Sequence, residues 1–260
     1  MMKIGFLGLG NMASAIIRGM KASGKFQNDI IIGFDRHKEK AEALQVVLLD
    51  SIQGLFSESD VLVFAVKPQS LTAIMESLPA QIDKNRLFVS IAAGKSLSWF
   101  EAYLGAVSIV RVMPNINSLV GCGVSAICGN STATEEQLSL VKSVFSSIGS
   151  VYELSETHFS AFSAIAGASP AYSFMYIDAL ASAAVKAGIP KALALSISTD
   201  AVLGSAKLLR ESGTHPSVLA DQVCSPGGTT IEGVHALREY GFENAVYKAI
   251  DAVIEKDKRL

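Results

Sequence analysis

Short apolar runs alternate with segments of helical apolar spacing along the chain as far as Leu154. The runs that predict strands are Lys3–Leu7, Ile30–Asp35, Val61–Pro68, Leu87–Gly94 and Val107–Asn115. Between the first two, Asn11–Ser23 has helical spacing and stops at Gly24, a common helix terminator. Strands that alternate with helices predict βαβ units and a mostly parallel sheet.

Beyond Leu154 the alternation ends and helical segments follow one another. The predicted helices are Thr157–Gly188, Pro190–Glu211, Pro216–Cys224 and Ile231–Leu260. The sequence therefore predicts an α/β domain over residues 1–154 and an all-helical domain over residues 155–260.

The composition is that of an ordinary globular protein. Of the 260 residues, 50% are hydrophobic and 18% are charged, and the formal net charge is −2. The chain has no excess of basic residues, so its charge gives no reason to expect a nucleic-acid partner. The three cysteines lack CxxC spacing and histidine partners, so we expect neither a disulfide framework nor a metal site, and we expect a reducing compartment such as the cytoplasm.

Two segments resemble membrane-directed signals. The start of the chain has a lysine, an apolar run and a small-residue tail, like a signal peptide, but the same residues fit a strand–turn–helix motif. Phe159–Ile177 carries no charge over nearly membrane-spanning length. It contains Gly167, Pro170 and several serines, so we interpret it as a buried or interface helix and expect no membrane partner.

The stretch "GLGNMA" (Gly8–Ala13) has G-x-G-x-x-A spacing between a predicted strand and a predicted helix. Gly8 permits a tight turn, Gly10 lets a pyrophosphate approach the backbone, and Ala13 lets the helix pack close to the strand. Free N–H groups at the helix start hold the phosphates. The motif predicts a dinucleotide site, with a ligand-free tight turn as the alternative.

Cofactor choice is open at the end of the second predicted strand. Asp35 stands where an acid can hold the ribose hydroxyls of NAD. Arg36, His37 and Lys38 follow directly and can bind the 2′-phosphate of NADP, or form a solvated helix start. The acid and the bases favour different cofactors.

Two further polar residues end predicted strands. Lys67 lies at the end of the third strand and Asn115 at the end of the fifth. Ligands of open α/β sheets bind outside the carboxyl ends of the strands, so both residues are expected to line the crevice. Taken alone, each can equally be an ordinary loop residue.

A second glycine cluster, "SPGGTTI" (Ser225–Ile231), interrupts the helical half. Thr229 and Glu232 have capping-box spacing, which predicts a helix with Thr229 as its N-cap. N–H groups converge at such a helix start and form an anion site. A small carboxylate fits it better than a nucleotide, because no βαβ unit surrounds it; a plain interhelical turn is the alternative.

Four blocks, in order, resemble pyrroline-5-carboxylate reductases. They are "GFLGLGNMASAI", "VRVMPNINSLVGCGVSAI", "SAIAGASPAYSFMYIDALASAAVKAGI" and "VCSPGGTTIEGVHALREYGF". The similarity covers nearly the whole chain, and the SPGGTT block is highly specific to that family. It implies an α/β Rossmann-type N-terminal domain, an all-α C-terminal dimerisation domain, and reduction of Δ1-pyrroline-5-carboxylate to L-proline with NAD(P)H, the last step of proline biosynthesis.

The resemblance also implies the site residues. Substrate would lie on Ser225, Gly228, Thr229, Thr230 and Asn115. The Thr230 hydroxyl would sit near the imine nitrogen as the catalytic group; we expect it to orient the ring, with the proton supplied by solvent or already carried by the imine. NADPH, or alternatively NADH, would lie on Gly8, Gly10, Asn11, Met12, Ala13, Asp35, Arg36, Ser51, Ala65, Val66, Lys67, Pro68, Ala93, Gly94, Met113 and Pro114.

The chain departs from the family pattern at three positions. Ser169 replaces a glycine in "GASPA", which can change helix packing near the substrate. Ser51 stands where asparagine is frequent, on the adenosine side of the cofactor. Asp35 precedes Arg36 where many members have asparagine, which keeps NADH use open.

Two other functions compete with the reductase. A β-hydroxyacid dehydrogenase of similar build would use a lysine on the first long interdomain helix, and Gly167–Leu180 contains none. A non-catalytic dinucleotide-sensing protein is the second alternative, against which the intact SPGGTT stretch argues. The Ala- and Ser-rich helices of Phe159–Ala206 favour close packing between subunits, and composition and resemblance together predict a homodimer or a larger assembly of dimers.

Overall fold

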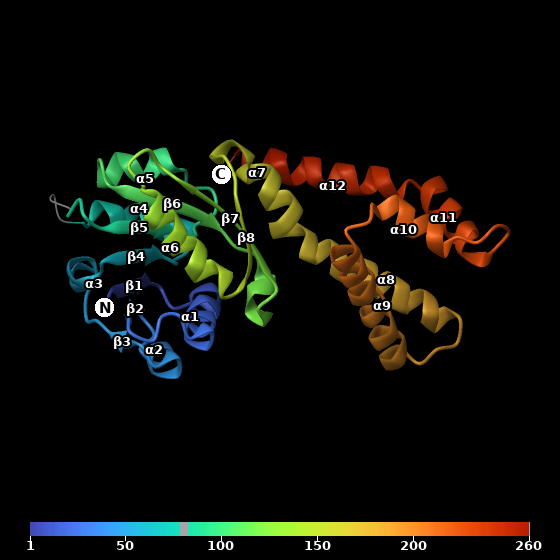
Figure 1. Ribbon diagram of the computed structural model, residues 1–260, viewed down its shortest axis with the longest axis horizontal. Coiled ribbons are helices and arrows are strands. Elements are labelled where there is room, and N and C mark those ends of the chain that lie inside the picture. The colour runs from blue at the N-terminus through green and yellow to red at the C-terminus, as the bar shows by residue number, and fades with distance from the viewer. Residues whose placement is uncertain (79–82, 260) are drawn as a thin grey trace. The chain divides into compact units, whose positions relative to one another are not determined.

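The computed structural model describes residues 1–78 and 83–259 (Figure 1). Two compact units divide the chain: unit 1 is Met1–Gly167 with the chain end from Ile254 onward, and unit 2 is Ala168–Val253. The predicted boundary after Leu154 thus falls inside unit 1. The residues that follow it stay with unit 1 because Phe159 and Phe162 pack into its core.

Unit 1 contains a sheet whose described strands are ordered β3-β2-β1-β4-β5-β6-β7-β8. Their bounds are β1 Lys3–Leu7, β2 Ile30–Phe34, β3 Val47–Leu48, β4 Val61–Phe64, β5 Leu87–Ser90, β6 Ser108–Met113, β7 Gly123–Gly129 and β8 Gly149–Glu153. Every neighbouring pair is parallel except β6 and β7. This confirms the predicted, mostly parallel sheet.

All five predicted strands are present, but several end earlier than predicted. The apolar runs of β4, β5 and β6 continue into loops, at Ala65–Lys67, Ile91–Gly94 and Pro114–Asn115. Those residues leave the sheet at its carboxyl edge instead of extending the strands. The strands β3, β7 and β8 were not predicted.

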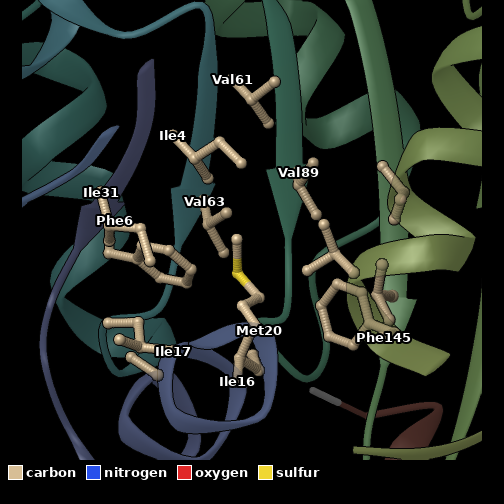
Figure 2. Close-up of a cluster of buried hydrophobic side chains, with 14 of the residues drawn as sticks. Ile4, Phe6, Ile16, Ile17, Met20, Ile31, Val61, Val63, Val89 and Phe145 are labelled. Atoms are coloured by element: carbon tan, nitrogen blue, oxygen red, sulfur yellow. The ribbon is translucent and has the colours of Figure 1, made fainter. Parts of the chain in front are cut away.

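Helices cover both faces of the sheet. The helices α1 (Asn11–Ser23), α2 (Glu39–Leu44) and α6 (Glu135–Ser146) pack on one face, and α3 (Ile52–Glu58), α4 (Pro68–Glu76) and α5 (Leu97–Leu104) pack on the other. Figure 2 shows the first layer: side chains of α1 and α6 meet the strands, and each large buried side chain contributes about 1.5–3 kcal/mol. The labelled members are Ile4, Phe6, Ile16, Ile17, Met20, Ile31, Val61, Val63, Val89 and Phe145.

The last part of unit 1 is helical but irregular. A 3-10 turn (Glu156–His158), the short α7 (Phe159–Phe162) and a π-helix (Ser163–Ala168) follow one another. The Ser160 hydroxyl donates to Asp257 Oδ2 over 2.6 Å, which fastens the end of α12 (Phe242–Asp257) to α7.

Unit 2 is helical, as predicted. It comprises α8 (Ser169–Lys186), α9 (Lys191–Ser212), α10 (Pro216–Val223), α11 (Thr229–Glu239) and most of α12, and α8 packs along α9 (Figure 1). The predicted helix Ile231–Leu260 is wrong as a single element, because the chain turns at Gly241 with φ +74° between α11 and α12.

One helix of the described residues, α9, is long and apolar enough to cross a membrane, by length and composition only. Its apolar side chains are largely exposed within the single chain, Leu203 at 65%. A surface of this kind calls for a covering partner.

Candidate functional site

The turn between β1 and α1 is held against the loop that follows β4. Gly8 has φ +96°, and its N–H donates to the Phe34 carbonyl over 2.8 Å. A Cβ on Gly8 would lie 2.9 Å from the Ala65 carbonyl oxygen and from Val66 Cγ1. Only glycine therefore fits this turn. The strand order reverses between β1 and β4, which is where open α/β sheets bind ligands.

Gly10 is a glycine for a different reason. It is the N-cap of α1 with φ −74°, and a Cβ there would meet no described atom within 4 Å. Nothing in the described part of the protein requires glycine, whereas a pyrophosphate lying on the helix start does. The first intrahelical bond runs from Ser14 N to Gly10 O over 2.8 Å, so the N–H groups of Asn11, Met12 and Ala13 have no partner among the described residues and are free for phosphate oxygens. The turn fits a dinucleotide.

The Asp35 carboxylate, which follows β2, clamps this turn. Its Oδ2 accepts from Leu9 N over 2.7 Å, and its Oδ1 accepts from His37 N over 2.9 Å. Lys40 Nζ lies 3.2 Å from Oδ1 and 3.3 Å from Oδ2. Burial raises the pKa of Asp35, but these hydrogen bonds and the Lys40 ammonium outweigh burial and hold the pKa below its ordinary value. The sequence pattern did not indicate Lys40 as a site residue.

Basic and hydroxyl groups lie near the same strand ends. Arg36 and Lys38 are exposed, and neither forms an ion pair within residues 1–78 and 83–259; His37 Nδ1 lies 3.3 Å from Glu39 Oε1. Ser51 caps α3, since its Oγ accepts from Gly54 N over 3.0 Å, which leaves its O–H free to donate. Leu49 N donates to Gly33 O over 2.9 Å, so the chain that leads to Ser51 runs beside the end of β2.

The other predicted cofactor residues lie at the same edge of the sheet, on loops or at the ends of elements. Lys67 is the exposed N-cap of α4, and Pro68 begins that helix. The remaining predicted residues end β6 or follow β5 and β6, whose carboxyl ends point the same way as those of β1 and β4. These are Ala93, Gly94, Met113 and Pro114. The structure thus brings the predicted dinucleotide residues to one edge of the sheet.

Asn115 has a buried position rather than an open one. Its Nδ2 donates to the Ala166 carbonyl over 2.9 Å, and its Oδ1 accepts from Val124 N over 3.0 Å. Both ends of the amide thus bond the backbone. In this structure Asn115 anchors β7 and the π-helix, which its position at the end of a predicted strand did not indicate, and the substrate contact implied by the resemblance stays a prediction.

The second glycine cluster, in unit 2, is an uncapped helix start. The turn passes through Gly227 at φ +67°, and α11 begins at Thr229 with Gly228 as N-cap. The predicted capping box with Thr229 as N-cap is therefore wrong by one position, and no described side chain caps α11. The N–H groups of its first turn and the hydroxyls of Thr229 and Thr230 are left available for an anion.

Gly228 itself is required by its neighbour. A Cβ on Gly228 would collide with Ser225 Oγ and lie 3.0 Å from the Ser225 carbonyl oxygen. Glycine at this position lets the Ser225 hydroxyl fold over the start of α11. The four predicted residues Ser225, Gly228, Thr229 and Thr230 thus lie together at the start of α11, and we refer to them as the cradle.

Other reactive centres are scarce in the described residues. They contain no group of three His, Cys, Asp or Glu side chains arranged to hold a metal ion. Burial, with the nearby Glu156 carboxylate, raises the pKa of the Cys128 thiol to about 12, so Cys128 is not a thiolate at neutral pH.

A mostly parallel sheet with a glycine turn suited to a dinucleotide, followed along the chain by a helical unit, is typical of a Rossmann-type oxidoreductase. Residues 3–94 match the family model described as NADP oxidoreductase coenzyme F420-dependent, and residues 156–260 match pyrroline-5-carboxylate reductase dimerisation. The chain belongs to the pyrroline-5-carboxylate reductase family.

Full-length relatives carry that assignment. The chain is 40% identical to a pyrroline-5-carboxylate reductase of Aquifex aeolicus, over 100% of this chain and 97% of the relative. The solved 1-pyrroline-5-carboxylate reductase of Streptococcus pyogenes is 39% identical with a TM-score of 0.90, covering 100% of this chain and 99% of the other. A Plasmodium falciparum pyrroline carboxylate reductase solved with NADP bound is 29% identical with a TM-score of 0.87, covering 99% and 97%.

Proposed function

We propose that this protein reduces Δ1-pyrroline-5-carboxylate to L-proline with NAD(P)H, the last step of proline biosynthesis. The observation that carries the proposal is the uncapped start of α11, where hydroxyls and free N–H groups converge beside Gly228. A small cyclic imine with one carboxylate matches that cradle. Membership of the reductase family supports the same substrate.

The cradle binds the substrate by its carboxylate. The N–H groups of the first turn of α11 and the Ser225 and Thr229 hydroxyls donate to the two carboxylate oxygens. The helix dipole adds about 0.3–1 kcal/mol for a negative charge at this end. Because the substrate is held at one end, the ring is fixed in orientation, which is the main requirement for transfer in a bound complex.

The dinucleotide supplies a hydride when bound. Gly8–Ala13 bind its pyrophosphate, and the loops after β4, β5 and β6 line the nicotinamide end of the crevice. A protonated imine is already electrophilic, so the protein needs neither a nucleophile nor a metal. The Thr230 hydroxyl hydrogen-bonds the ring nitrogen and orients the ring, and the proton either comes from solvent or is already on the imine when it binds.

The assembly we propose is a homodimer or a larger assembly of dimers. The exposed apolar side chains of α8 and α9 support it, among them Phe174, Met175 and Leu203, since they need a covering surface. Burial of α9 between subunits also accounts for its hydropathy without a membrane. The free cysteines of the described residues fit a reducing compartment, and we place the protein in the cytoplasm.

The test is a Thr230→Ala variant assayed with Δ1-pyrroline-5-carboxylate and NADPH. We expect kcat/KM to fall at least tenfold while the Kd of NADPH, measured by calorimetry, stays within twofold. Thr214→Ala is the matched control, because Thr214 lies outside the cradle. Equal loss of cofactor affinity and normal turnover would contradict the assigned role. Tight NADPH binding by the wild-type protein without any turnover would favour a dinucleotide sensor.

A further inference from the structure

We propose that Lys40 sets the cofactor preference of this chain by occupying the Asp35 carboxylate, so that the crevice takes NADPH rather than NADH. The inference deepens the proposed function and rests on it only in that a nicotinamide dinucleotide binds the β1–α1 turn. Asp35 by itself is the kind of residue that selects NADH, because an acid there accepts hydrogen bonds from the ribose hydroxyls.

The acceptor capacity of Asp35 is already used. An ionised carboxylate offers about four lone-pair positions. Leu9 N and His37 N fill one on each oxygen at 2.7 and 2.9 Å, and Lys40 Nζ reaches both oxygens at 3.2 and 3.3 Å. A ribose diol can bind Asp35 only by displacing one of these donors. The two amides belong to the folded backbone, so Lys40 is the donor that would have to leave.

The charge of Asp35 is offset as well. The Asp35 side chain is 12% exposed and that of Lys40 is 38% exposed, so the pair is partly shielded from water. Because Lys40 offsets the negative charge of Asp35, the positive charges of Arg36 and Lys38 dominate the electrostatic field at the end of β2. The nearby Glu39 carboxylate is paired with His37. A 2′-phosphate, with nearly two negative charges at neutral pH, is attracted there, and the guanidinium of Arg36 can bind it in bidentate fashion.

The same contacts give the acid a structural role. Asp35 holds Leu9 N inside the glycine turn, so it shapes the phosphate cradle even though it does not meet the ribose. The low pKa of Asp35 is consistent with a carboxylate that stays ionised in this clamp. Lys40 is therefore a positioning residue that acts through Asp35.

The experiment measures binding rather than turnover. Kd values of NADPH and NADH are determined by calorimetry for the wild-type protein, Lys40→Met, Lys40→Arg and Lys38→Met. Lys40→Met frees two lone-pair positions and the charge of Asp35, so we expect NADH to bind at least threefold more tightly and NADPH at least threefold more weakly. The NADH-to-NADPH Kd ratio then falls about tenfold, which is about 1.4 kcal/mol.

The controls separate this effect from a general loss of positive charge. Lys38→Met removes the same charge two residues away, so it is expected to weaken NADPH without tightening NADH. Lys40→Arg keeps the ion pair and the wild-type ratio. In Lys40→Met/Asp35→Asn the gain for NADH should vanish, because the acid that accepts the ribose is gone.

An unchanged ratio in Lys40→Met, with the melting temperature within about 2 °C of wild type, would overturn the proposal. If Lys40→Met lowers the melting temperature by more than this, binding is measured instead with the fragments adenosine 2′,5′-bisphosphate and AMP. A ratio of the two fragment Kd values that equals the wild-type ratio would also overturn the proposal. A shifted ratio in a protein that fails to reduce pyrroline-5-carboxylate would sink the proposed function and leave this inference standing.

Discussion

The side-chain amide of Asn115, at the end of β6, donates a hydrogen bond to the Ala166 carbonyl oxygen in the π-helix over 2.9 Å. The other end of the same amide accepts from Val124 N at the start of β7. One buried side chain therefore ties a sheet loop, the adjoining strand and an irregular helix together. Irregular π turns often mark functional regions, and this one is fixed by a bond that a regular α-helix would not need.

Removing this amide should destabilise the protein. In Asn115→Ala the part-buried Val124 N–H and the buried Ala166 carbonyl each lose this partner, and an unsatisfied buried group costs about 1–3 kcal/mol. We expect the free energy of unfolding in urea to fall by about 2–4 kcal/mol. The control is Asn117→Ala, because the Asn117 side chain makes no hydrogen bond within the described residues. Its free energy of unfolding should fall by less than about 0.5 kcal/mol. A normal stability with a raised KM would instead make Asn115 a substrate ligand.

The two glycines of the first turn should respond differently to alanine. At Gly10 the backbone suits alanine and the space is open, so Gly10→Ala should fold normally, with stability within about 0.5 kcal/mol of wild type. Its methyl group occupies the place of the pyrophosphate, so the Kd of NADPH should rise at least tenfold.

Gly8→Ala is the contrasting variant. Alanine at φ +96° is strained, and its Cβ would press on the Ala65 carbonyl. The free energy of unfolding should therefore fall by about 1–3 kcal/mol. Calorimetry with NADPH and thermal unfolding of both variants measure the two effects. If the Gly10→Ala protein binds NADPH normally, the pyrophosphate does not lie on this turn.

Much of unit 1 was predictable because its strands are apolar runs and its first helix has clear ends. The helix Asn11–Ser23 was predicted with the bounds that the structure has, since Gly24 terminates it in the left-handed conformation. In contrast, β8 was missed because its residues are only partly buried and alternate weakly. Such an edge strand forms because β7 is there to pair with it, which a local pattern does not contain.

The parts of the site that depend only on residue spacing were predictable from the sequence. The side-chain pairings were not, because they depend on the three-dimensional arrangement. The pattern Thr-x-x-Glu is satisfied at Thr229, but the helix starts there instead of one residue later, with Gly228 as N-cap. At Thr134 the analogous box with Gln137 forms both of its bonds. Lys40 escaped notice because its pairing with Asp35 depends on how α2 returns past the end of β2.

Gly228→Ala should impair substrate binding through Ser225. The added Cβ collides with the Ser225 hydroxyl, which must rotate away from the start of α11. We expect the KM for pyrroline-5-carboxylate to rise at least fivefold with the Kd of NADPH unchanged. The control is Gly233→Ala, inside α11 with open space around it, which should stabilise the helix by up to about 1 kcal/mol and leave KM alone.

A double variant shows whether Ser225 mediates this effect. If the loss in Gly228→Ala is the displacement of one hydroxyl, then Ser225→Ala/Gly228→Ala should be no worse than Ser225→Ala. Strictly additive losses in KM would mean that Gly228 acts on the helix start directly, without Ser225.

Asp35 should make the free energy of unfolding depend on pH in the acidic range. Its folded-state pKa is held below the ordinary value, so its contribution is present above the unfolded pKa of about 3.9 and is lost as pH falls through the folded pKa. Asp35→Asn removes an acceptor of charge-assisted bonds to Leu9, His37 and Lys40, and should cost about 1–3 kcal/mol at pH 7. The gap between wild type and variant should narrow as pH falls below about 4. Urea unfolding from pH 7 to pH 2.5, at one protein concentration, measures it, with Asp221→Asn as an exposed control; a gap that stays constant over this range would show that the charge of Asp35 does not stabilise the turn.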